Sequence, residues 1–178
     1  MPQAELPFPC VAIDFETSGR AAHFACAVGL VRIEDGRVTA RFESLIRPPS
    51  SQVWFTHIHG LRWRDLKDQP TFAEVWPLAA GILEGTRYLL AHNAQFDRRV
   101  LQACCCVAGL EPPLQPFLCT LRGARAAPLG LRSRSLNHVC AYFGIPLNHH
   151  NAASDAEGCA RIYARLRELG VSDAIMRI

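Results

Sequence analysis

The sequence predicts an α/β fold in which one mixed β-sheet is flanked by α-helices. The first 50 residues contain three apolar runs, and a turn signal separates the second run from the third, which is typical of antiparallel strands. Later in the chain a short apolar run leads directly into a long helical pattern, and strand-to-helix units of this kind favour parallel strands. We therefore expect a sheet that begins antiparallel and continues parallel.

Three strands are expected at the start of the chain, over residues 10–15, 25–33 and 37–48. The turn signal EDGR joins the second and third strands as a hairpin. Pro48 and Pro49 end the third strand, because proline cannot donate a hydrogen bond to a neighbouring strand. Residues 50–70 show no sustained periodicity and are expected to be irregular or short-helical.

Helices dominate the rest of the chain. Thr71 as N-cap, with Glu74 three residues later, predicts the start of a helix that ends at Gly85 and is weakened by Pro77. The expected elements after it are a buried strand over 87–93 and helices over 94–110, 135–143 and 153–169. The segment 111–134 is rich in Pro and Arg and is expected to be a connection with one turn of helix.

The length and composition predict a single domain, residues 1–178, with a core over about residues 10–169. At 178 residues and 49% hydrophobic, the chain can bury a sizeable core. A net charge of +3 permits a nucleic-acid partner without requiring one. No apolar run reaches the roughly 18 residues of a membrane span, and the N-terminus lacks the features of a signal peptide. We expect a cytoplasmic protein without membrane contact.

The eight cysteines lie mostly in apolar runs, and no Cys-x-x-Cys pair occurs. This pattern predicts buried thiols in a reducing compartment, and it disfavours both disulfides and a zinc site.

Two carboxylates interrupt the first predicted strand. Asp14 and Glu16 lie two residues apart, and side chains alternate across a strand, so both carboxylates point from the same face. Acidic residues are depleted from strands, and adjacent like charges repel. Either this face is solvated or a cation lies beside it.

Two further segments add acids. Asp97 lies in the first turn of the helix after the buried strand, and Asp155 lies in the first turn of the last helix, five residues after His150. Taken singly, each acid is typical of a helix N-terminus, where the helix dipole favours negative charge. Together the four carboxylates form a hard ligand set suited to Mg²⁺ or Mn²⁺. A pair of such ions is a standard arrangement for displacement at phosphorus.

These segments resemble a known family. DFET (14–17), HNAQFD (92–97) and HNAASD (150–155) are similar, in order and spacing, to the three motifs of the DEDDh, or DnaQ-like, 3′-to-5′ exonucleases, which include proofreading epsilon subunits and RNase T. The segments HIHGL and SLNHVCAYFGIPL also resemble the family, and the resemblance covers about residues 10–169. It implies an RNase H-like fold.

The resemblance also implies a role for each motif residue. Two Mg²⁺ or Mn²⁺ ions would be held by Asp14, Glu16, Asp97 and Asp155. His150 would be the general base that accepts the proton of the attacking water, and the product would be a nucleoside 5′-monophosphate. His149 is the alternative base, but the five-residue spacing of the family selects His150.

The same resemblance implies weaker assignments around the terminal nucleotide, to Thr17, His59 and Phe96. Of Trp54 and Phe55, at most one is expected to stack on a base. Asn93 is expected to support the strand-to-helix turn. The histidines expected to have only hydrogen-bonding roles, at the surface or in the core, are His23, His57, His92 and His138.

An arginine cluster lies in the Pro- and Arg-rich connection and comprises Arg122, Arg125, Arg132 and Arg134. It either tracks substrate phosphates or forms a solvated loop. In the same segment Cys119 stands where many family members have Asp, which leaves the local substrate contacts open.

The function expected from these observations is a metal-dependent 3′-to-5′ exonuclease acting on single-stranded ends, with DNA slightly favoured over RNA. Two alternatives come from other classes: a catalytically inactive nucleic-acid-binding or polymerase-accessory module of the same fold, and a metal phosphatase acting on small nucleotides. A DNA polymerase is a candidate partner. The motifs do not choose among proofreading, repair and RNA trimming, and they leave the oligomeric state open.

Overall fold

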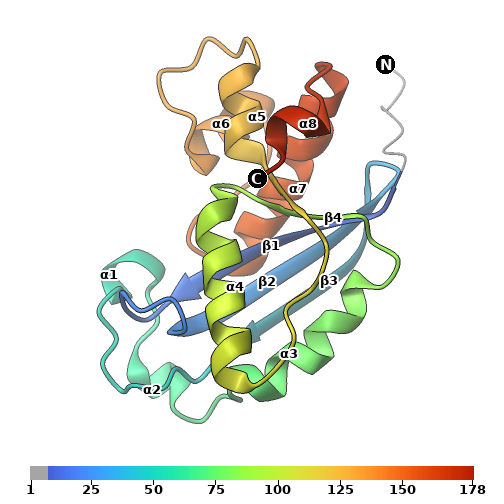
Figure 1. Ribbon diagram of the computed structural model, residues 1–178. Helices are drawn as coiled ribbons and strands as arrows, with labels where there is room; N and C mark the ends of the chain where they lie inside the picture. The colour runs from blue at the N-terminus through green and yellow to red at the C-terminus, as the bar shows by residue number, and fades with distance from the viewer. Residues whose placement is uncertain (1–7) are drawn as a thin grey trace.

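The computed structural model describes residues 8–178 (Figure 1). Its single sheet contains β1 (Cys10–Thr17), β2 (Ala25–Glu34), β3 (Arg37–Leu45), β4 (Tyr88–Ala91) and β5 (Phe117–Cys119), in the order β3-β2-β1-β4-β5. The β1–β2 and β2–β3 pairs are antiparallel, whereas the β1–β4 and β4–β5 pairs are parallel. The predicted change from antiparallel to parallel pairing is confirmed.

Helices cover both faces of the sheet. Figure 1 shows α4 (Ala94–Ala108) in front of the strands and α7 (Ala152–Glu168) behind them. The α4 face also carries α3 (Phe72–Ala80), and the α7 face carries α5 (Thr120–Ala126) and α6 (Leu136–Phe143). The short elements are α1 (Thr56–His59), α2 (Trp63–Leu66), the 3-10 turn η1 (Gly81–Leu83) and α8 (Asp173–Met176). No helix in the described part of the chain is long and apolar enough to cross a membrane.

The two faces of β1 enter different apolar clusters. Val11, Ile13 and Phe15 pack with α3 and α4, whereas Cys10 and Ala12 pack with α6 and α7. Because strand side chains alternate, the even-numbered residues that follow Ala12 continue the α7 face. The strand therefore points its two carboxylates toward the side of the sheet that α7 covers.

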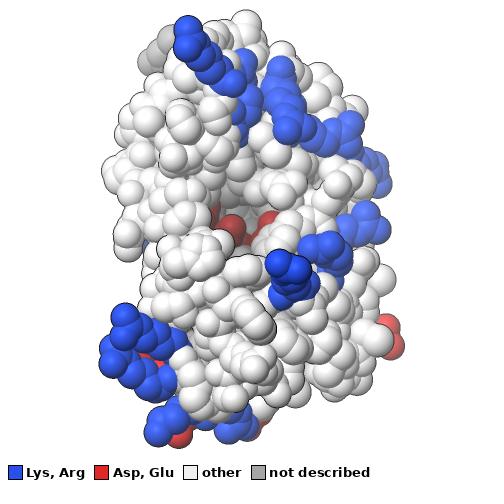
Figure 2. Space-filling model, turned by 90° about the vertical axis from the view of Figure 1, so that its left-hand side faces the viewer, with Lys and Arg blue, Asp and Glu red and all other residues white. Residues whose placement is uncertain are grey.

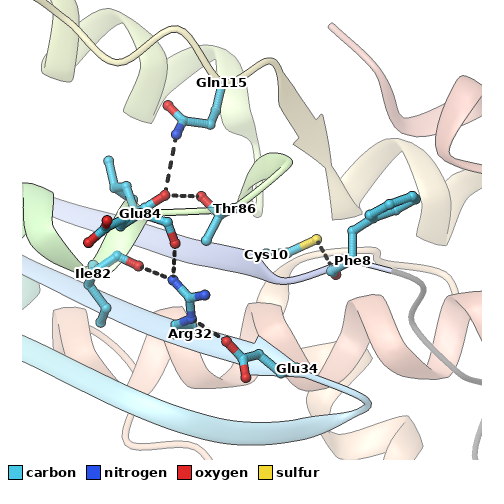
Figure 3. Close-up of polar contacts among 9 residues, drawn as sticks. Phe8, Cys10, Arg32, Glu34, Ile82, Glu84, Thr86 and Gln115 are labelled. Atoms are coloured by element: carbon cyan, nitrogen blue, oxygen red, sulfur yellow. Dashed lines mark hydrogen bonds and ion pairs between the residues drawn. The ribbon is translucent and has the colours of Figure 1, made fainter.

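Polar contacts fix the turn that precedes β4 (Figure 3). Arg32 of β2 donates to the backbone oxygens of Ile82, at 2.9 Å, and Glu84, at 2.6 Å, and it pairs with Glu34 at 2.6 Å. Thr86 Oγ1 and Gln115 Nε2 both donate to the backbone oxygen of Leu83. These bonds hold the end of η1 against the sheet, where β4 enters beside β1.

The structure departs from the predicted elements mainly near the C-terminus. β5 and α5 lie within the predicted connection 111–134, and α5 is longer than the single turn expected there. A three-residue strand is too short to show a period, so the sequence gives little signal for it. α8 was also missed, and the buried side chains of Val171 and Met176 extend the packed core beyond residue 169.

Two predicted elements end at least three residues earlier than expected. β3 ends at Leu45 rather than at the prolines. The helix expected over 71–85 ends at Ala80, where η1 begins. Pro77 lies on the exposed side of α3, so the helix keeps its buried stripe despite the missing amide donor.

All eight cysteines are free thiols, and all except Cys106 are buried. The prediction of buried thiols without disulfides is confirmed for seven of them. Cys106 lies on the exposed side of α4.

Candidate active site

The carboxylates of β1 lie at a cavity of about 600 Å³. Figure 2 shows acidic atoms at the bottom of a hollow, with Lys and Arg side chains around it rather than in its depth. Asp14 and Glu16 both line the cavity. The strand geometry predicted from the sequence is therefore confirmed, because the two side chains share one face.

The N-terminus of α7 brings the third carboxylate. The Asn151 side chain caps this helix by accepting a hydrogen bond from the Ser154 backbone N–H at 2.9 Å, and Asp155 lies in the first turn. Gly29 of β2 pairs with Asp14 across the sheet, and a Cβ atom on Gly29 would lie only 2.3 Å from the Ala152 backbone oxygen. The absence of a side chain at this glycine lets α7 approach the sheet closely.

Asp14, Glu16 and Asp155 form a compact acidic cluster. One carboxylate oxygen from each lies within 4.8 Å of the other two. Asp155 is buried, and its Oδ2 accepts hydrogen bonds from the backbone N–H of His150, at 3.1 Å, and from the His149 ring nitrogen, at 2.9 Å. Its Oδ1 is buried without any hydrogen-bond partner, which is costly for a carboxylate oxygen unless a cation or a donor occupies the site.

Asp97 joins the site from the opposite face of the sheet. It lies in the first turn of α4, which begins after Asn93 in a left-handed conformation (φ 78°), and its Oδ1 accepts the Phe15 backbone N–H at 3.1 Å. Asn93 therefore supports the strand-to-helix turn, as predicted. Asp97 is almost fully buried, lies outside the compact acidic cluster and does not line the cavity. It stands behind β1, close enough for its charge to act on Asp14.

Burial raises the pKa of all four carboxyl groups, and the charges of neighbouring carboxylates add to this effect for Asp14, Glu16 and Asp97. Burial is the largest cause for each, and it raises the pKa of Asp14 well above its usual range, with the charges of Asp97, Asp155 and Glu16 adding to the effect. The pKa of Glu16 rises to about 7 and that of Asp97 to about 8, and the pKa of Asp155 is also raised. Among the described residues, no Lys or Arg forms an ion pair with any of the four.

This arrangement fits divalent cations. The donors are hard carboxylate oxygens that converge, one of them has no partner, and no Lys or Arg of residues 8–178 forms an ion pair with them. Oxygen-only donor sets of this kind suit Mg²⁺ or Mn²⁺.

Two adjacent histidines lie beside Asp155. The rings of His149 and His150 stack with centroids 3.9 Å apart and an interplanar angle of 21°, and both line the cavity. His149 is tied to Asp155 through Nδ1. The backbone of His150 is left-handed, with φ 67°, and within residues 8–178 its ring has no hydrogen-bond partner. Burial and the neighbouring His149 charge lower the pKa of His150.

The structure also places the weaker candidates. Thr17, His59, Phe96 and Phe55 all line the cavity, whereas Trp54 does not, although it is 65% exposed. Of the two aromatic candidates, Phe55 is thus the one at the site. His59 Nδ1 accepts the Leu61 backbone N–H at 3.1 Å, and burial lowers the pKa of His59.

His92 lies at the site, where only a hydrogen-bonding role away from it was expected. It lines the cavity, and its ring nitrogens lie 2.9 Å from Thr120 Oγ1 and 2.8 Å from the Arg134 backbone oxygen. The hydrogen-bonding role expected for it is confirmed. Burial is the main cause that lowers the pKa of His92 to about 4. The sequence signal that could have placed His92 at the site is the HNAQFD segment, which begins with this histidine.

The arginine cluster divides into separate roles. Arg134 donates to the backbone oxygens of Ala124 and Leu131, and Arg122 donates to the backbone oxygen of Arg177. Arg125 lines the cavity. Neither of the two expected alternatives, a phosphate track or a solvated loop, therefore describes all four arginines.

Comparison with known proteins identifies the family to which the chain belongs. A family profile described as "Exonuclease" matches residues 11–163. The PolC-type DNA polymerase III of Thermotoga petrophila is 33% identical over 165 residues, which is 89% of this chain and 12% of that protein. The DNA polymerase III subunit epsilon of Aquifex aeolicus is 29% identical over 165 residues, covering 89% of this chain and 80% of that one. The chain thus spans about an eighth of the length of the PolC-type relatives.

Solved structures show the same fold. The nuclease domain of 3′hExo, described as a DEDDh family member bound to rAMP, superimposes with a TM-score of 0.76 at 18% identity, covering 94% of this chain and 96% of that domain. The RNase H-like fold implied by the sequence resemblance is confirmed. On the family match over residues 11–163, the chain belongs to the exonuclease family, and it shares the fold of the DEDDh nuclease domain.

Proposed function

We propose that this protein is a divalent-metal-dependent 3′-to-5′ exonuclease that hydrolyses the terminal phosphodiester of single-stranded nucleic acid, with DNA slightly favoured over RNA. The observation that supports this most directly is the compact acidic cluster, in which Asp155 keeps a buried oxygen without a partner and no Lys or Arg in the described part of the chain forms an ion pair with the acids. A binding module has no need for such a costly arrangement.

The protein's side chains divide the work of the reaction. Asp14, Glu16 and Asp155 would hold two Mg²⁺ or Mn²⁺ ions, with Asp97 completing the set from behind β1. When bound, such ions activate water for attack on phosphorus and stabilise the charge on the departing 3′ oxygen. Holding the carboxylates on three packed elements keeps this geometry fixed before substrate arrives.

His150 is the proposed general base. Its ring lines the cavity and is free of hydrogen bonds to the described residues, whereas His149 is engaged with Asp155. The lowered pKa of His150 keeps its imidazole neutral near pH 7, which is the form that accepts a proton. Thr17, His59 and Phe96 would enclose the terminal nucleotide, whose release gives a nucleoside 5′-monophosphate.

The test is digestion of matched 5′-labelled DNA and RNA oligomers with Mn²⁺, Mg²⁺ or EDTA. We expect a metal-dependent ladder that shortens from the 3′ end, lost in Asp14→Ala and slowed about 10²- to 10⁴-fold in His150→Ala. Asp68→Ala, which removes an exposed acid away from the cavity, is the control and should match wild type. Wild-type protein that binds the oligomers but leaves them intact under every metal would instead support the inactive accessory module.

The names of the relatives favour DNA and a polymerase partner within the same proposal. Both curated relatives described above are chains of DNA polymerase III. We therefore expect faster trimming of DNA than of RNA, and faster removal of a mismatched than of a paired primer end, because a frayed end enters the site as a single strand. Equal rates on mismatched and paired ends would argue against a proofreading role. The single-domain organisation and the cytoplasmic location stay predictions.

A further inference from the structure

Arg125 is the single Lys or Arg among the described residues that line the acidic cavity. It lies on α5, four residues after Leu121, which lines the same cavity. Residues four apart share one side of a helix. The exposed guanidinium is therefore presented on the side of α5 that faces the site.

The guanidinium of Arg125 has no partner within residues 8–178. It forms neither an ion pair nor a hydrogen bond there, whereas Arg122 and Arg134 are bound to backbone oxygens. In particular it does not pair with any carboxylate of the site, although it is close enough to His92 to contribute to that residue's lowered pKa. A cation in this position is available to a ligand.

A hydrogen-bond chain holds α5 in place. Thr120, the first residue of α5, is buried, and its Oγ1 is 2.9 Å from His92 Nδ1. His92 Nε2 is 2.8 Å from the Arg134 backbone oxygen, and Arg134 Nε donates to the Ala124 oxygen at 2.9 Å. The chain closes on the residue next to Arg125, so it fixes the backbone from which the guanidinium extends.

The charges of the cavity indicate which group Arg125 contacts. A scissile phosphate must lie against the acidic cluster, where bound cations balance the carboxylates. Arg125 is not paired with that cluster, so its natural partner is a phosphate farther along the strand. Guanidinium groups match phosphate oxygens in geometry and charge.

We propose that Arg125 binds the non-scissile phosphate on the 5′ side of the cleaved linkage, and that this contact makes the site select polymers over mononucleotides. This inference rests on the proposed exonuclease function. It assigns a specificity role to one arginine of the cluster and a structural role to Arg122 and Arg134.

The test compares two substrates in wild type, Arg125→Gln and Arg125→Lys. One is an oligothymidylate, and the other is the 4-nitrophenyl ester of thymidine 5′-monophosphate, which has one phosphodiester and no further phosphate. Arg122→Gln, which removes the same charge from the same helix outside the cavity, is the matched control. We expect Arg125→Gln to raise KM for the oligomer about tenfold, to leave the ester unchanged, and to be partly rescued in Arg125→Lys.

The salt dependence gives an independent readout. Loss of one phosphate contact to a single strand should reduce the slope of log affinity against log salt by about 0.7. Oligomer binding measured with Ca²⁺ in place of Mg²⁺ needs no turnover, so it tests Arg125 even if wild type is inactive. If wild type binds oligomers without cleaving them and Arg125→Gln binds them more weakly, the Arg125 contact is supported while the proposed function fails.

Two results would overturn the inference. Unchanged oligomer binding and KM in Arg125→Gln would show that the arginine contacts no phosphate. Equal losses on the oligomer and the ester would place it at the scissile phosphate instead. Because Arg125 is exposed and has no partner among the described residues, the melting temperature of Arg125→Gln should match wild type, which separates these outcomes from misfolding.

Discussion

Replacing Glu16 with glutamine removes one negative charge from the acidic cluster and preserves the size of the side chain. In the absence of metal, this substitution should stabilise the protein at pH 8. The reason is that Glu16 is ionised at that pH while partly buried beside Asp155, whose charge adds to the desolvation that raises the pKa of Glu16. Function and stability thus make opposite demands on this residue.

The magnitude follows from the pKa. The ordinary value for Glu16 is 4.5, and the folded protein raises it to about 7. A raised pKa for an acid means that folding favours the protonated form. The contribution of Glu16 to the free energy of unfolding is therefore fully present below pH 4.5 and is lost as the pH rises through 7. The difference is worth about 3 kcal/mol at about 1.4 kcal/mol per pH unit. Solvent screens part of it because Glu16 is only partly buried, which leaves about 1–2 kcal/mol.

The assay is urea unfolding at pH 5 and pH 8, in EDTA and in excess Mn²⁺. In EDTA we expect Glu16→Gln to exceed wild type by about 1–2 kcal/mol at pH 8 and to match it near pH 5. In Mn²⁺ the order should reverse, because a ligand at 100 times its Kd stabilises the native state by about 2.7 kcal/mol and the variant has lost a ligand oxygen. Glu111→Gln, at an exposed site, should show neither effect. A variant that is less stable than wild type at pH 8 in EDTA would refute the reasoning.

Three further predictions concern neighbouring residues. Gly29→Ala should destabilise the protein by about 1–3 kcal/mol and abolish activity, because the new Cβ atom would collide with the α7 backbone. Gly81→Ala is the control, because Gly81 has open space around it and a helical φ of −58°. This control should be neutral in the same unfolding and digestion assays. Because the folded state lowers the pKa of His92 to about 4, wild type should lose about 3 kcal/mol as the pH falls from 6.5 to 4, and His92→Gln should lack this loss in unfolding titrations. His150→Ala should lower kcat far more than His149→Ala, and the reverse order in single-turnover assays would make His149 the base.

The sequence predicted the parts of the site that follow from local periodicity. Because strand side chains alternate, Asp14 and Glu16 had to share a face, and the structure places them on the face that α7 covers. Asp155 was expected in the first turn of the last helix, and the structure places it in the first turn of α7. These features depend on residues close in sequence, so a single chain is enough to infer them.

Features that depend on contacts between distant segments could not be predicted. Nothing local to Gly29 indicates that α7 crosses above it, and the pairing of His92 with Thr120 and Arg134 joins three separate segments. The division of the arginine cluster is of the same kind. Arg134 became structural because the Ala124 and Leu131 oxygens lie within its reach, which no composition or spacing reveals.

The difference in length between β1 and β4 creates the site. β4 pairs with β1 only along residues 10–12, so the edge of β1 is open at Phe15, whose backbone N–H needs another partner. Asp97 provides it. On the other side, Gly29 opposite Asp14 admits α7 and with it Asp155. Each carboxylate is thus held by an element that packs into the apolar core, and its repulsion cannot be relieved by moving that element without opening the core. Neutralisation, by protons or by divalent cations, is the response left to the site.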